Sequence, residues 1–325
     1  MANPKIFVSR RVPEPVHAVL QDSFSLSYHD AQEPLPRNEL LDRVAGMDGL
    51  VTTLTERVDA ELLDAAGSQL EVVANYAVGF DNVDLDAANA RDVLVTNTPD
   101  VLTEATAEFA ISLMLSLMRR VTDGDRFLRN RQSWIWAPTM KLSTSPRGRV
   151  LGVVGFGRIG REAARLGSAL GMRVIYSDFA TISSDEYEQV PLDRLLAQAD
   201  VVSVHCPLSP ETHHLIGERE LQAMRSDAFL INTARGPVVD EQALIAALRA
   251  GEIAGAGIDV FEEEPKVPEA LLDFDNVVVT PHLASATHDT REAMGTLCFD
   301  ALKAVLLEGR APDHALNAAT VSRGG

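Results

Sequence analysis

Three residues that could bind an anion or move a proton each follow a separate apolar run in the second half of the chain. Arg235 lies in NTARGPVVD, Glu264 in DVFEEEP and His282 in TPHLASAT. If those runs are strands of one parallel sheet, their carboxyl ends share an edge, and the three side chains meet there. A guanidinium next to a carboxylate and an imidazole suits a site that binds a small acid and transfers a proton.

Taken singly, each of these residues also has a structural interpretation. An arginine at a strand end can pair with a structural carboxylate, and a lone histidine is more often a satisfied structural residue. Glu264 stands in Glu-Glu-Glu-Pro, which also suits a solvated turn. Their combination with a nucleotide-binding motif in the same predicted sheet favours function over structure.

That motif is Gly155-Phe-Gly-Arg-Ile-Gly160, a GxGxxG sequence that follows an apolar run and opens a helical segment. In this context the first glycine permits a tight turn, Gly157 lets a pyrophosphate approach the backbone, and Gly160 lets helix and strand pack closely. The amino end of the helix then attracts the phosphates. We therefore expect Arg158 and Ile159, inside the motif, to contact the cofactor as well.

Asp178 follows the next predicted strand, 18 residues after Gly160 (178 − 160). An acidic side chain at this spacing bonds the ribose hydroxyls of NAD and repels the additional phosphate of NADP. The residues just beyond, Phe-Ala-Thr-Ile, contain no cation that would hold that phosphate. The sequence thus predicts NAD as the cofactor, with NADH preferred over NADPH.

Short apolar runs alternate with helical segments along most of the chain, which is typical of α/β proteins with parallel sheets. The runs at 149–155, 173–177, 200–205, 228–233, 254–260 and 276–280 predict six strands of a doubly wound sheet. Five shorter runs lie in the first hundred residues. Long helices are predicted at 103–120, with Thr103 as a possible N-cap, and at 288–308. If the end of the chain returns to the first domain, the chain passes between the two domains twice. Two such crossings predict a hinge and a cleft between two lobes.

Length, charge and cysteine content exclude several classes of protein. The chain has 325 residues, enough for two domains, and its net charge of −18 disfavours nucleic acid and anionic membranes as partners. No apolar run is long enough to suggest a membrane span. Only Cys206 and Cys298 are present, which suits a reducing cytoplasm better than a disulfide framework. The histidines 213, 214 and 288 lack a supporting cluster, so no metal site is expected.

Two further segments have open interpretations. ANYAVGFDNVD follows the strand-like EVVAN, and its Gly79 suggests a turn whose N–H groups either cradle a small anion or simply end the strand. Residues 129–148 form a long irregular stretch that contains both tryptophans, and loops of that length are commonly functional or disordered.

Nearly end to end, the chain resembles the D-2-hydroxyacid dehydrogenase family, and most closely its glyoxylate/hydroxypyruvate reductases. The resemblance rests on VANYAVGFDNVD, VTNTPDVLTEATAE, VVGFGRIG, HCPLSPETHHLI, INTARGPVVDEQAL, AGAGIDVFEEEP and TPHLASAT, in this order. It implies a Rossmann cofactor domain over 101–287, and a flavodoxin-like substrate domain over 1–100 and 288–325. It also implies a homodimer in which the loop at 129–148 reaches toward the partner's active site.

The resemblance also implies roles for individual residues in reducing a small 2-keto acid to the D-2-hydroxy acid. Arg235 would bind the carboxylate and keto oxygen, His282 would be the acid/base, and Glu264 would pair with His282. The backbone of Val78 and Gly79 would hold the carboxylate, and Ser285 would line the substrate site. Further residues implied on the cofactor side are Thr106, Cys206, Pro207, Thr212, Thr233, Ala234, Asp259 and His282.

Two features leave the substrate open. Ala284 replaces a glycine common in close relatives, and the segment around Met140 differs from relatives with a bulkier residue there. Other D-2-hydroxy acids, such as phosphoglycerate or lactate, therefore stay as alternatives. A non-catalytic NAD-dependent regulator is a further alternative, because the corepressors that resemble this family keep the same three residues.

Overall fold

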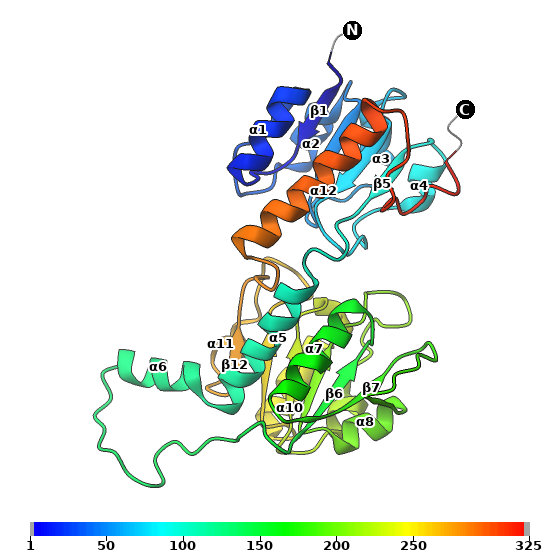
Figure 1. Ribbon diagram of the computed structural model, residues 1–325. Coiled ribbons are helices and arrows are strands. Elements are labelled where there is room, and N and C mark those ends of the chain that lie inside the picture. The colour runs from blue at the N-terminus through cyan, green and yellow to red at the C-terminus, as the bar shows by residue number, and fades with distance from the viewer. Residues whose placement is uncertain (1–2, 322–325) are drawn as a thin grey trace. The chain divides into compact units, whose positions relative to one another are not determined.

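A computed structural model describes residues 3–321, which divide into two compact units. Unit 1 contains the residues up to Leu102 together with those from Ala286, and unit 2 is Thr103–Ser285. Each unit holds one parallel sheet with helices on both faces (Figure 1). The predicted fold class, two doubly wound α/β domains, is confirmed.

The sheet of unit 2 has seven parallel strands in the order β12-β11-β10-β9-β6-β7-β8. Their bounds are β6 Val150–Val154, β7 Arg173–Ser177, β8 Glu188–Gln189, β9 Val201–Val204, β10 Phe229–Asn232, β11 Gly255–Ile258 and β12 Val277–Val279. The winding reverses between β6 and β9, and the carboxyl ends of strands at such a reversal are where α/β proteins bind ligands.

Helices cover both faces of this sheet. α5 (Thr103–Met118) and α7 (Arg158–Ala169) pack on one face, around a core that includes Leu151, Val153 and Tyr176. α8 (Leu192–Gln198), α9 (Glu218–Ala223) and α10 (Glu241–Ala250) cover the other face, and α11 (Glu269–Leu272) precedes β12. Because both faces are buried, the central strands are mostly apolar rather than alternating.

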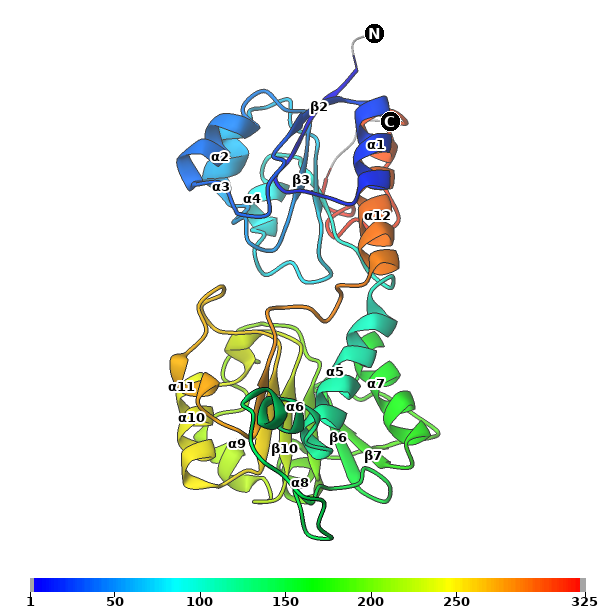
Figure 2. The same ribbon diagram turned by 90° about the vertical axis from the view of Figure 1, so that its left-hand side faces the viewer.

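The sheet of unit 1 has five parallel strands in the order β2-β1-β3-β4-β5. These are β1 Lys5–Val8, β2 Ser25–Tyr28, β3 Gly49–Thr52, β4 Val72–Asn75 and β5 Leu94–Thr96. α2 (Arg37–Val44), α3 (Ala60–Ala66) and α4 (Leu85–Asn89) lie on one face, with α1 (Glu14–Ser23) and α12 (His288–Leu306) on the other (Figure 2).

α12 is fitted closely to unit 1 although it comes from the far end of the chain. A Cβ at Gly49 of β3 would lie 2.7 Å from Cδ2 of Leu302, so a larger residue there would force that leucine side chain to shift. In the same way Gly295 of α12 faces Val16 of α1, whose Cγ2 would be 2.5 Å from an added Cβ. The two glycines let a helix and its neighbours approach more closely than larger residues allow.

The structure differs from the sequence prediction in several elements of unit 2. β8 was not predicted, because a strand of two residues leaves no periodic pattern. The helix predicted at 103–120 ends at Met118, Arg120 takes a left-handed conformation with φ 55°, and α6 (Val121–Arg129) begins after it. Thr103 is the first residue of α5 rather than a residue before it.

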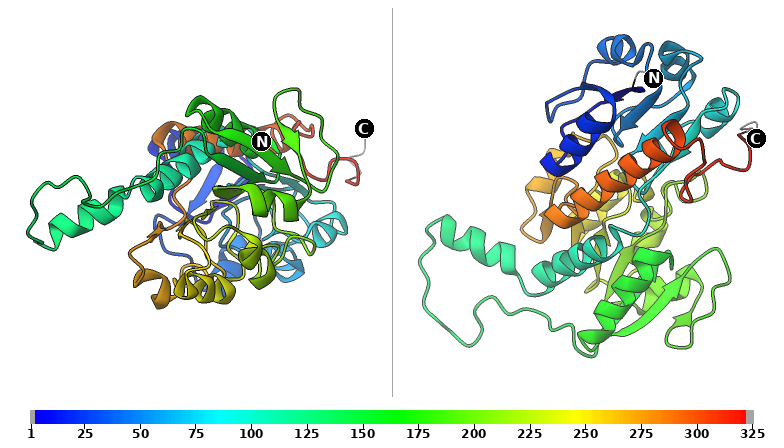
Figure 3. Two further views of the ribbon diagram at one scale, coloured as in Figure 1. Left: turned by 90° about the horizontal axis from the view of Figure 1, so that it is seen from below. Right: turned by 45° about the horizontal axis from the view of Figure 1, so that its top comes forward.

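α6 and the loop after it project from the rest of unit 2 as an arm (Figure 3). None of the residues of α6 is buried. Large apolar side chains of the arm are exposed, including Trp134 at 56%, Ile135 at 87% and Trp136 at 74%. Within residues 3–321 no helix is both long and apolar enough to cross a membrane.

Candidate active site

The three glycines of the motif have distinct surroundings at the start of α7. Gly155 has φ 90°, and a Cβ there would lie 2.5 Å from the backbone nitrogen of Cys206. A Cβ at Gly160 would lie 2.1 Å from the carbonyl oxygen of Gly155. By contrast, nothing stands within 4 Å of a Cβ at Gly157. Gly155 and Gly160 thus allow close packing, whereas Gly157 borders open space.

α7 begins next to this open space without a side-chain cap. Its N-cap is Gly157, which has no side chain to accept a hydrogen bond from the first turn, and Arg158 and Ile159 are its first residues. The amino end of a helix carries partial positive charge and favours an anion.

A cavity of about 820 Å³ adjoins the glycine turn at the carboxyl ends of β6, β7 and β9. Its lining includes Gly155, Gly157, Asp178, Cys206, Pro207 and Thr212. Asp178 is fixed there by two backbone donors, since Oδ2 accepts from Phe156 N at 2.7 Å and Oδ1 accepts from Ala180 N at 3.0 Å. Six residues that the sequence predicted as cofactor contacts therefore line a single cavity.

Other residues of this cavity were missed from the sequence. Gln189 donates to the carbonyl oxygens of Asp178 and Ala180, at 3.2 and 2.8 Å, and so closes the turn after β7. His205 stands at the end of β9, with Nε2 2.8 Å from Ser203 Oγ, and burial lowers its pKa to about 4. Its strand-end position was the signal available, as for Arg235.

Thr212 organises the turn that carries Pro207. Its hydroxyl donates to the carbonyl oxygen of Pro207 at 2.6 Å and accepts from Ser209 N at 2.7 Å. Burial raises the pKa of the Cys206 thiol to about 12, so the thiol stays protonated at neutral pH.

Arg235 follows β10, and a side chain missed from the sequence shapes its turn. Asn232 is buried, accepts from Ala234 N at 3.0 Å and donates to the carbonyl oxygen of Arg235 at 2.9 Å. The next residue, Gly236, opens the short 3₁₀ helix η1 (Gly236–Val238). A Cβ on Gly236 would lie 1.9 Å from the backbone carbon of Phe261, so only glycine lets this segment reach the one that carries Glu264.

Glu264 and His282 form a hydrogen-bonded pair. His282 Nδ1 lies 2.9 Å from Glu264 Oε2, and Glu264 Oε1 accepts from Phe261 N at 3.1 Å. The side chains are 24% and 26% exposed for His282 and Glu264. Burial raises the pKa of Glu264, but the hydrogen bond and charge of His282, the Phe261 N–H and the charge of Arg235 together hold that pKa below its usual value.

Asp259, at the end of β11, fixes the loop that carries His282. Its Oδ1 accepts from Thr280 Oγ1 at 2.6 Å and Leu283 N at 2.8 Å, while Oδ2 accepts from Ala284 N at 2.9 Å. Burial raises the pKa of this fully buried carboxyl in spite of these donors. His282 itself has φ 54°, and its N–H bonds the carbonyl oxygen of Asp259 at 2.8 Å. The loop thus turns sharply and holds the imidazole beside Glu264.

The Val78–Gly79 turn belongs to unit 1. Two asparagines that the sequence did not predict as site residues hold it in place. Asn75 donates to the carbonyl oxygen of Gly79 at 2.9 Å, and Asn97 donates to that of Val78 at 2.7 Å. With its carbonyls bonded to these amides, the turn keeps its backbone conformation fixed. Val78 and Gly79 are partly exposed.

The remaining predicted residues lie at several places. Thr106 is buried in the first turn of α5, and Ala234 and Ser285 are partly exposed in the loops after β10 and β12. The hydroxyl of Thr233 is buried and has no hydrogen-bond partner among the described residues. An unsatisfied buried hydroxyl is uncommon and indicates a missing polar partner.

Residues 111–284 match the sequence profile of the family described as "D-isomer specific 2-hydroxyacid dehydrogenase, NAD binding domain". A protein from Korarchaeum cryptofilum named glyoxylate reductase is 44% identical over 322 residues, which are 97% of this chain and 96% of that protein. The chain belongs to the D-isomer specific 2-hydroxyacid dehydrogenase family. It is therefore an oxidoreductase with a domain for a nicotinamide cofactor.

Solved structures agree with this assignment. A protein from Thermus thermophilus has a TM-score of 0.91 and 43% identity, over 96% of this chain and 99% of that one. An NADPH-dependent glyoxylate/hydroxypyruvate reductase from Sinorhizobium meliloti, solved with NADP and malonate, has a TM-score of 0.85 and 36% identity, over 100% of this chain and 99% of that one.

The residues at the glycine turn fit a dinucleotide. The space at Gly157, the start of α7 without a side-chain cap and the fixed carboxylate of Asp178 are what a pyrophosphate and a ribose need. The orphaned Thr233 hydroxyl supplies one more polar group at a strand end. Among residues 3–321, no group of three or more His, Cys, Asp or Glu could hold a metal ion.

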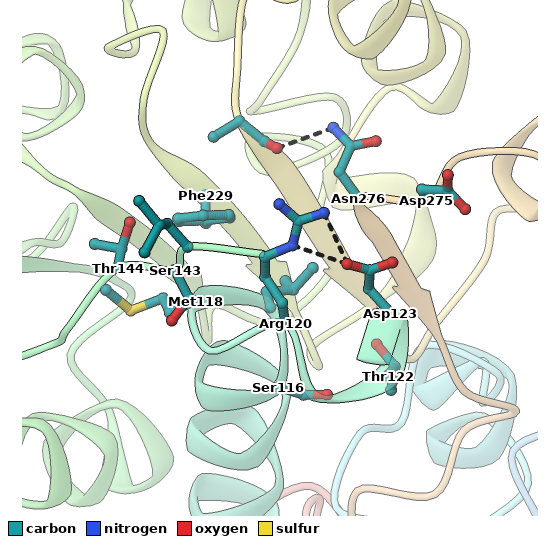
Figure 4. A pocket seen from close by; sticks show the side chains of 13 residues that line it. Ser116, Met118, Arg120, Thr122, Asp123, Ser143, Thr144, Phe229, Asp275 and Asn276 are labelled. Atoms are coloured by element: carbon teal, nitrogen blue, oxygen red, sulfur yellow. Dashed lines mark hydrogen bonds and ion pairs between the residues drawn. The ribbon is translucent and has the colours of Figure 1, made fainter. Parts of the chain in front are cut away.

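A second cavity, of about 350 Å³, lies at the base of the arm (Figure 4). Phe229 and Asn276, in its lining, stand at the amino ends of β10 and β12, the edge opposite to Arg235 and His282. Beside it Asp123 accepts from Arg120 at 2.7 Å and from Lys141 at 2.9 Å, which ties the loop back to α6.

Proposed function

We propose that this protein reduces a small 2-keto acid, glyoxylate or hydroxypyruvate, to the D-2-hydroxy acid with a nicotinamide cofactor. The observation that carries the proposal is the Glu264–His282 pair, which lies within electrostatic reach of Arg235 at the carboxyl edge of the dinucleotide-type sheet. The names of the relatives from K. cryptofilum and S. meliloti support the choice of substrate.

Each residue of the site has a distinct task in this proposal. When bound, the nicotinamide supplies the hydride. His282 donates a proton from its imidazolium to the keto oxygen, and Glu264 stabilises the imidazolium before transfer. Arg235 holds the carboxylate and keto oxygen with its planar fork and stabilises the developing negative charge. Val78 and Gly79 donate backbone N–H groups to the carboxylate, and Ser285 borders the substrate.

We propose NADH as the preferred cofactor. Asp178 is held by two N–H groups, so a ribose hydroxyl can donate to its remaining acceptor positions, whereas a phosphate there would meet a negative charge. Thr106, Thr233 and Asp259 would contact the nicotinamide half. We assign cofactor binding to residues 101–287, and substrate binding to 1–100 with 288–325.

We also propose that the protein is a cytoplasmic homodimer joined through the arm. The exposed apolar side chains of the arm support this proposal, because contiguous exposed apolar surface commonly marks a protein interface. Both cysteines are buried free thiols, which suits a reducing compartment.

The decisive assay follows NADH consumption with glyoxylate, hydroxypyruvate, pyruvate and phenylpyruvate. The highest kcat/KM is expected with glyoxylate or hydroxypyruvate. A higher value with a larger acid would replace the proposed substrate while keeping the reaction class. Absence of turnover with every acid, together with tight NADH binding, would contradict the proposal in favour of a regulator.

A further inference from the structure

Two glutamates outside the proposed catalytic group exchange hydrogen bonds between their backbones and side chains. Glu241 N donates to Glu262 Oε1 at 3.0 Å, and Glu262 N donates to Glu241 Oε1 at 2.8 Å. Glu241 is the first residue of α10 and is only 8% exposed. We call this reciprocal arrangement the glutamate clamp.

The clamp joins the two segments that carry Arg235 and Glu264. Glu241 ends the stretch that starts at Arg235 and runs through η1, and Glu262 lies in the turn that ends at Glu264. The same two segments have a second contact, where Gly236 meets the backbone of Phe261. Two separate contacts leave little freedom for one segment to slide or rotate against the other.

A third side chain completes the clamp. His214 Nε2 lies 3.0 Å from Glu262 Oε1, and its Nδ1 lies 3.7 Å from Asp240 Oδ2. Asp240 in turn caps α10, because its Oδ1 accepts from the N–H groups of Gln242 and Ala243, each at 3.0 Å. The first three N–H groups of α10 thus meet carboxylates, and one of those carboxylates belongs to the turn that carries Glu264.

This arrangement exceeds what capping a helix requires. Asp240 alone provides the side-chain cap that helices commonly have. Burial, together with the charges of Glu262, Glu263 and Glu264, raises the pKa of Glu241 above its usual value. Placing the buried Glu241 carboxyl among three other carboxyls is unfavourable. Its position beside the Glu262 N–H group therefore needs an explanation other than helix capping.

We propose that Glu241 and Glu262 are positioning residues, whose reciprocal hydrogen bonds set the place of the Glu264 carboxylate relative to Arg235 and His282. The inference rests on the proposed function, in which Glu264 acts on His282. Displacing a catalytic group by about 1 Å can slow a reaction about a hundredfold. The clamp therefore acts on the proton transfer without touching the substrate.

The test compares Glu262→Ala and Glu241→Ala with Glu264→Gln. Each alanine change is expected to lower kcat/KM for glyoxylate reduction by roughly tenfold to a hundredfold. Each should also move the alkaline limb of its pH profile to lower pH, as Glu264→Gln does. In the Glu264→Gln background neither change should move the limb further. Glu241→Gln keeps an oxygen that accepts from Glu262 N, and it should restore most of the activity.

Glu263→Gln is the matched control. It removes the same charge one residue away, but among the described residues Glu263 forms its ion pair only with Lys266, at 3.1 Å, where the side chains are 75% and 79% exposed. It should behave like the wild type. NADH dissociation constants, measured by fluorescence, should be unchanged in all variants. If Glu262→Ala does not fold, Glu241→Ala serves alone, because it leaves the Asp240 and Glu262 caps of α10 in place.

Three outcomes would overturn the inference. If Glu264→Gln moves the limb but neither alanine change does, the clamp has no positioning role and the proposed function stands. The same holds if the alanine changes move the limb equally with and without Glu264→Gln, since independent effects add. If Glu264→Gln leaves the alkaline limb of the pH profile in place, both the inference and the proposed role of Glu264 fail.

Discussion

The two oxygens of the Glu264 carboxylate have different partners, Phe261 N and His282 Nδ1. The backbone donor fixes the direction of the carboxylate, so the other oxygen faces the imidazole. Because its pKa lies below the usual value for a glutamate, Glu264 is ionised throughout the neutral range and loses its charge only in acid. The imidazole thus has a permanent negative neighbour at working pH.

Glu264→Gln is expected to shift two pH profiles in the same direction. Reduction needs protonated His282, and Glu264→Gln removes the carboxylate that pairs with this imidazolium. The alkaline limb of kcat/KM for glyoxylate reduction should therefore move to lower pH. Oxidation needs neutral His282, so its acid limb should move to lower pH too. If both limbs stay in place, the Glu-Glu-Glu-Pro segment is a solvated turn and nothing more.

Arg235 is expected to be needed for its shape as well as its charge. Arg235→Lys keeps the charge but loses the planar fork, and Arg235→Ala loses both. The alanine variant should lose about 2–5 kcal/mol of transition-state stabilisation, and lysine should lose less. Steady-state kcat/KM with several 2-keto acids measures both. Near-wild-type values would remove Arg235 from the substrate site.

Asp178 is expected to make NADH the better cofactor. Its fixed carboxylate repels a phosphate on the adenosine ribose, so kcat/KM at equal glyoxylate should be higher with NADH than with NADPH. Asp178→Ser should lower the ratio of kcat/KM with NADH to kcat/KM with NADPH, because it weakens NADH binding and removes the repulsion of the NADPH phosphate. Equal or higher values with NADPH in the wild type would require a cation elsewhere for the phosphate.

At the level of elements, the close approach of η1 and the Phe261–Glu264 turn depends on Gly236. In Gly236→Ala the new Cβ would overlap the Phe261 backbone, where no flexible side chain can yield. We expect roughly 1–3 kcal/mol of lost stability, as for other overpacked sites, together with a lower kcat/KM. Thermal unfolding and kinetics measure the two effects.

Gly124→Ala is the control for that experiment. Gly124 lies in α6, and nothing stands within 4 Å of an added Cβ. Alanine favours a helix over glycine by up to about 1 kcal/mol, so stability should stay the same or rise. A Gly236→Ala protein as stable and active as Gly124→Ala would show that the approach of the two segments is not needed.

Much of this arrangement was predictable from the sequence because it depends on local pattern. Buried parallel strands are continuous apolar runs, and the residue after each run lies at the carboxyl edge, which brought Arg235, Glu264 and His282 to one edge. The glycine motif has a fixed spacing of its own. The roles of these residues stay predictions, whereas the doubly wound fold is confirmed.

What the sequence did not predict depends on contacts between distant segments. The fit of Gly236 to Phe261 and the clamp of Glu241 with Glu262 join segments more than twenty residues apart. α6 was also missed, and none of its residues is buried against the rest of unit 2. Asn75 and Asn97 act through amides that point at a turn, for which a sequence holds no periodic signal.

At the level of the whole molecule, we expect the arm to join two copies of the chain. Trp134 or Trp136 should pack against the second copy, since large exposed aromatic side chains gain stability by burial. Sedimentation should give a dimer, and Trp136→Asp should shift it toward monomer. Val19→Asp, at an apolar residue of α1 that is 42% exposed, is the control and should leave the protein a dimer. A wild-type monomer at all accessible concentrations would contradict this.

The order of the elements along the chain also determines when each part can fold during synthesis on the ribosome. The five strands of unit 1 are complete by Leu102, but α12, which covers one face of their sheet, starts at His288. The 183 residues of unit 2 (285 − 103 + 1) must be synthesised in between. At about 5–20 residues per second this takes about 9–37 s. During that interval α12 does not yet cover the apolar face of β3 and β4, and apolar surface exposed in this way makes a folding chain prone to aggregation.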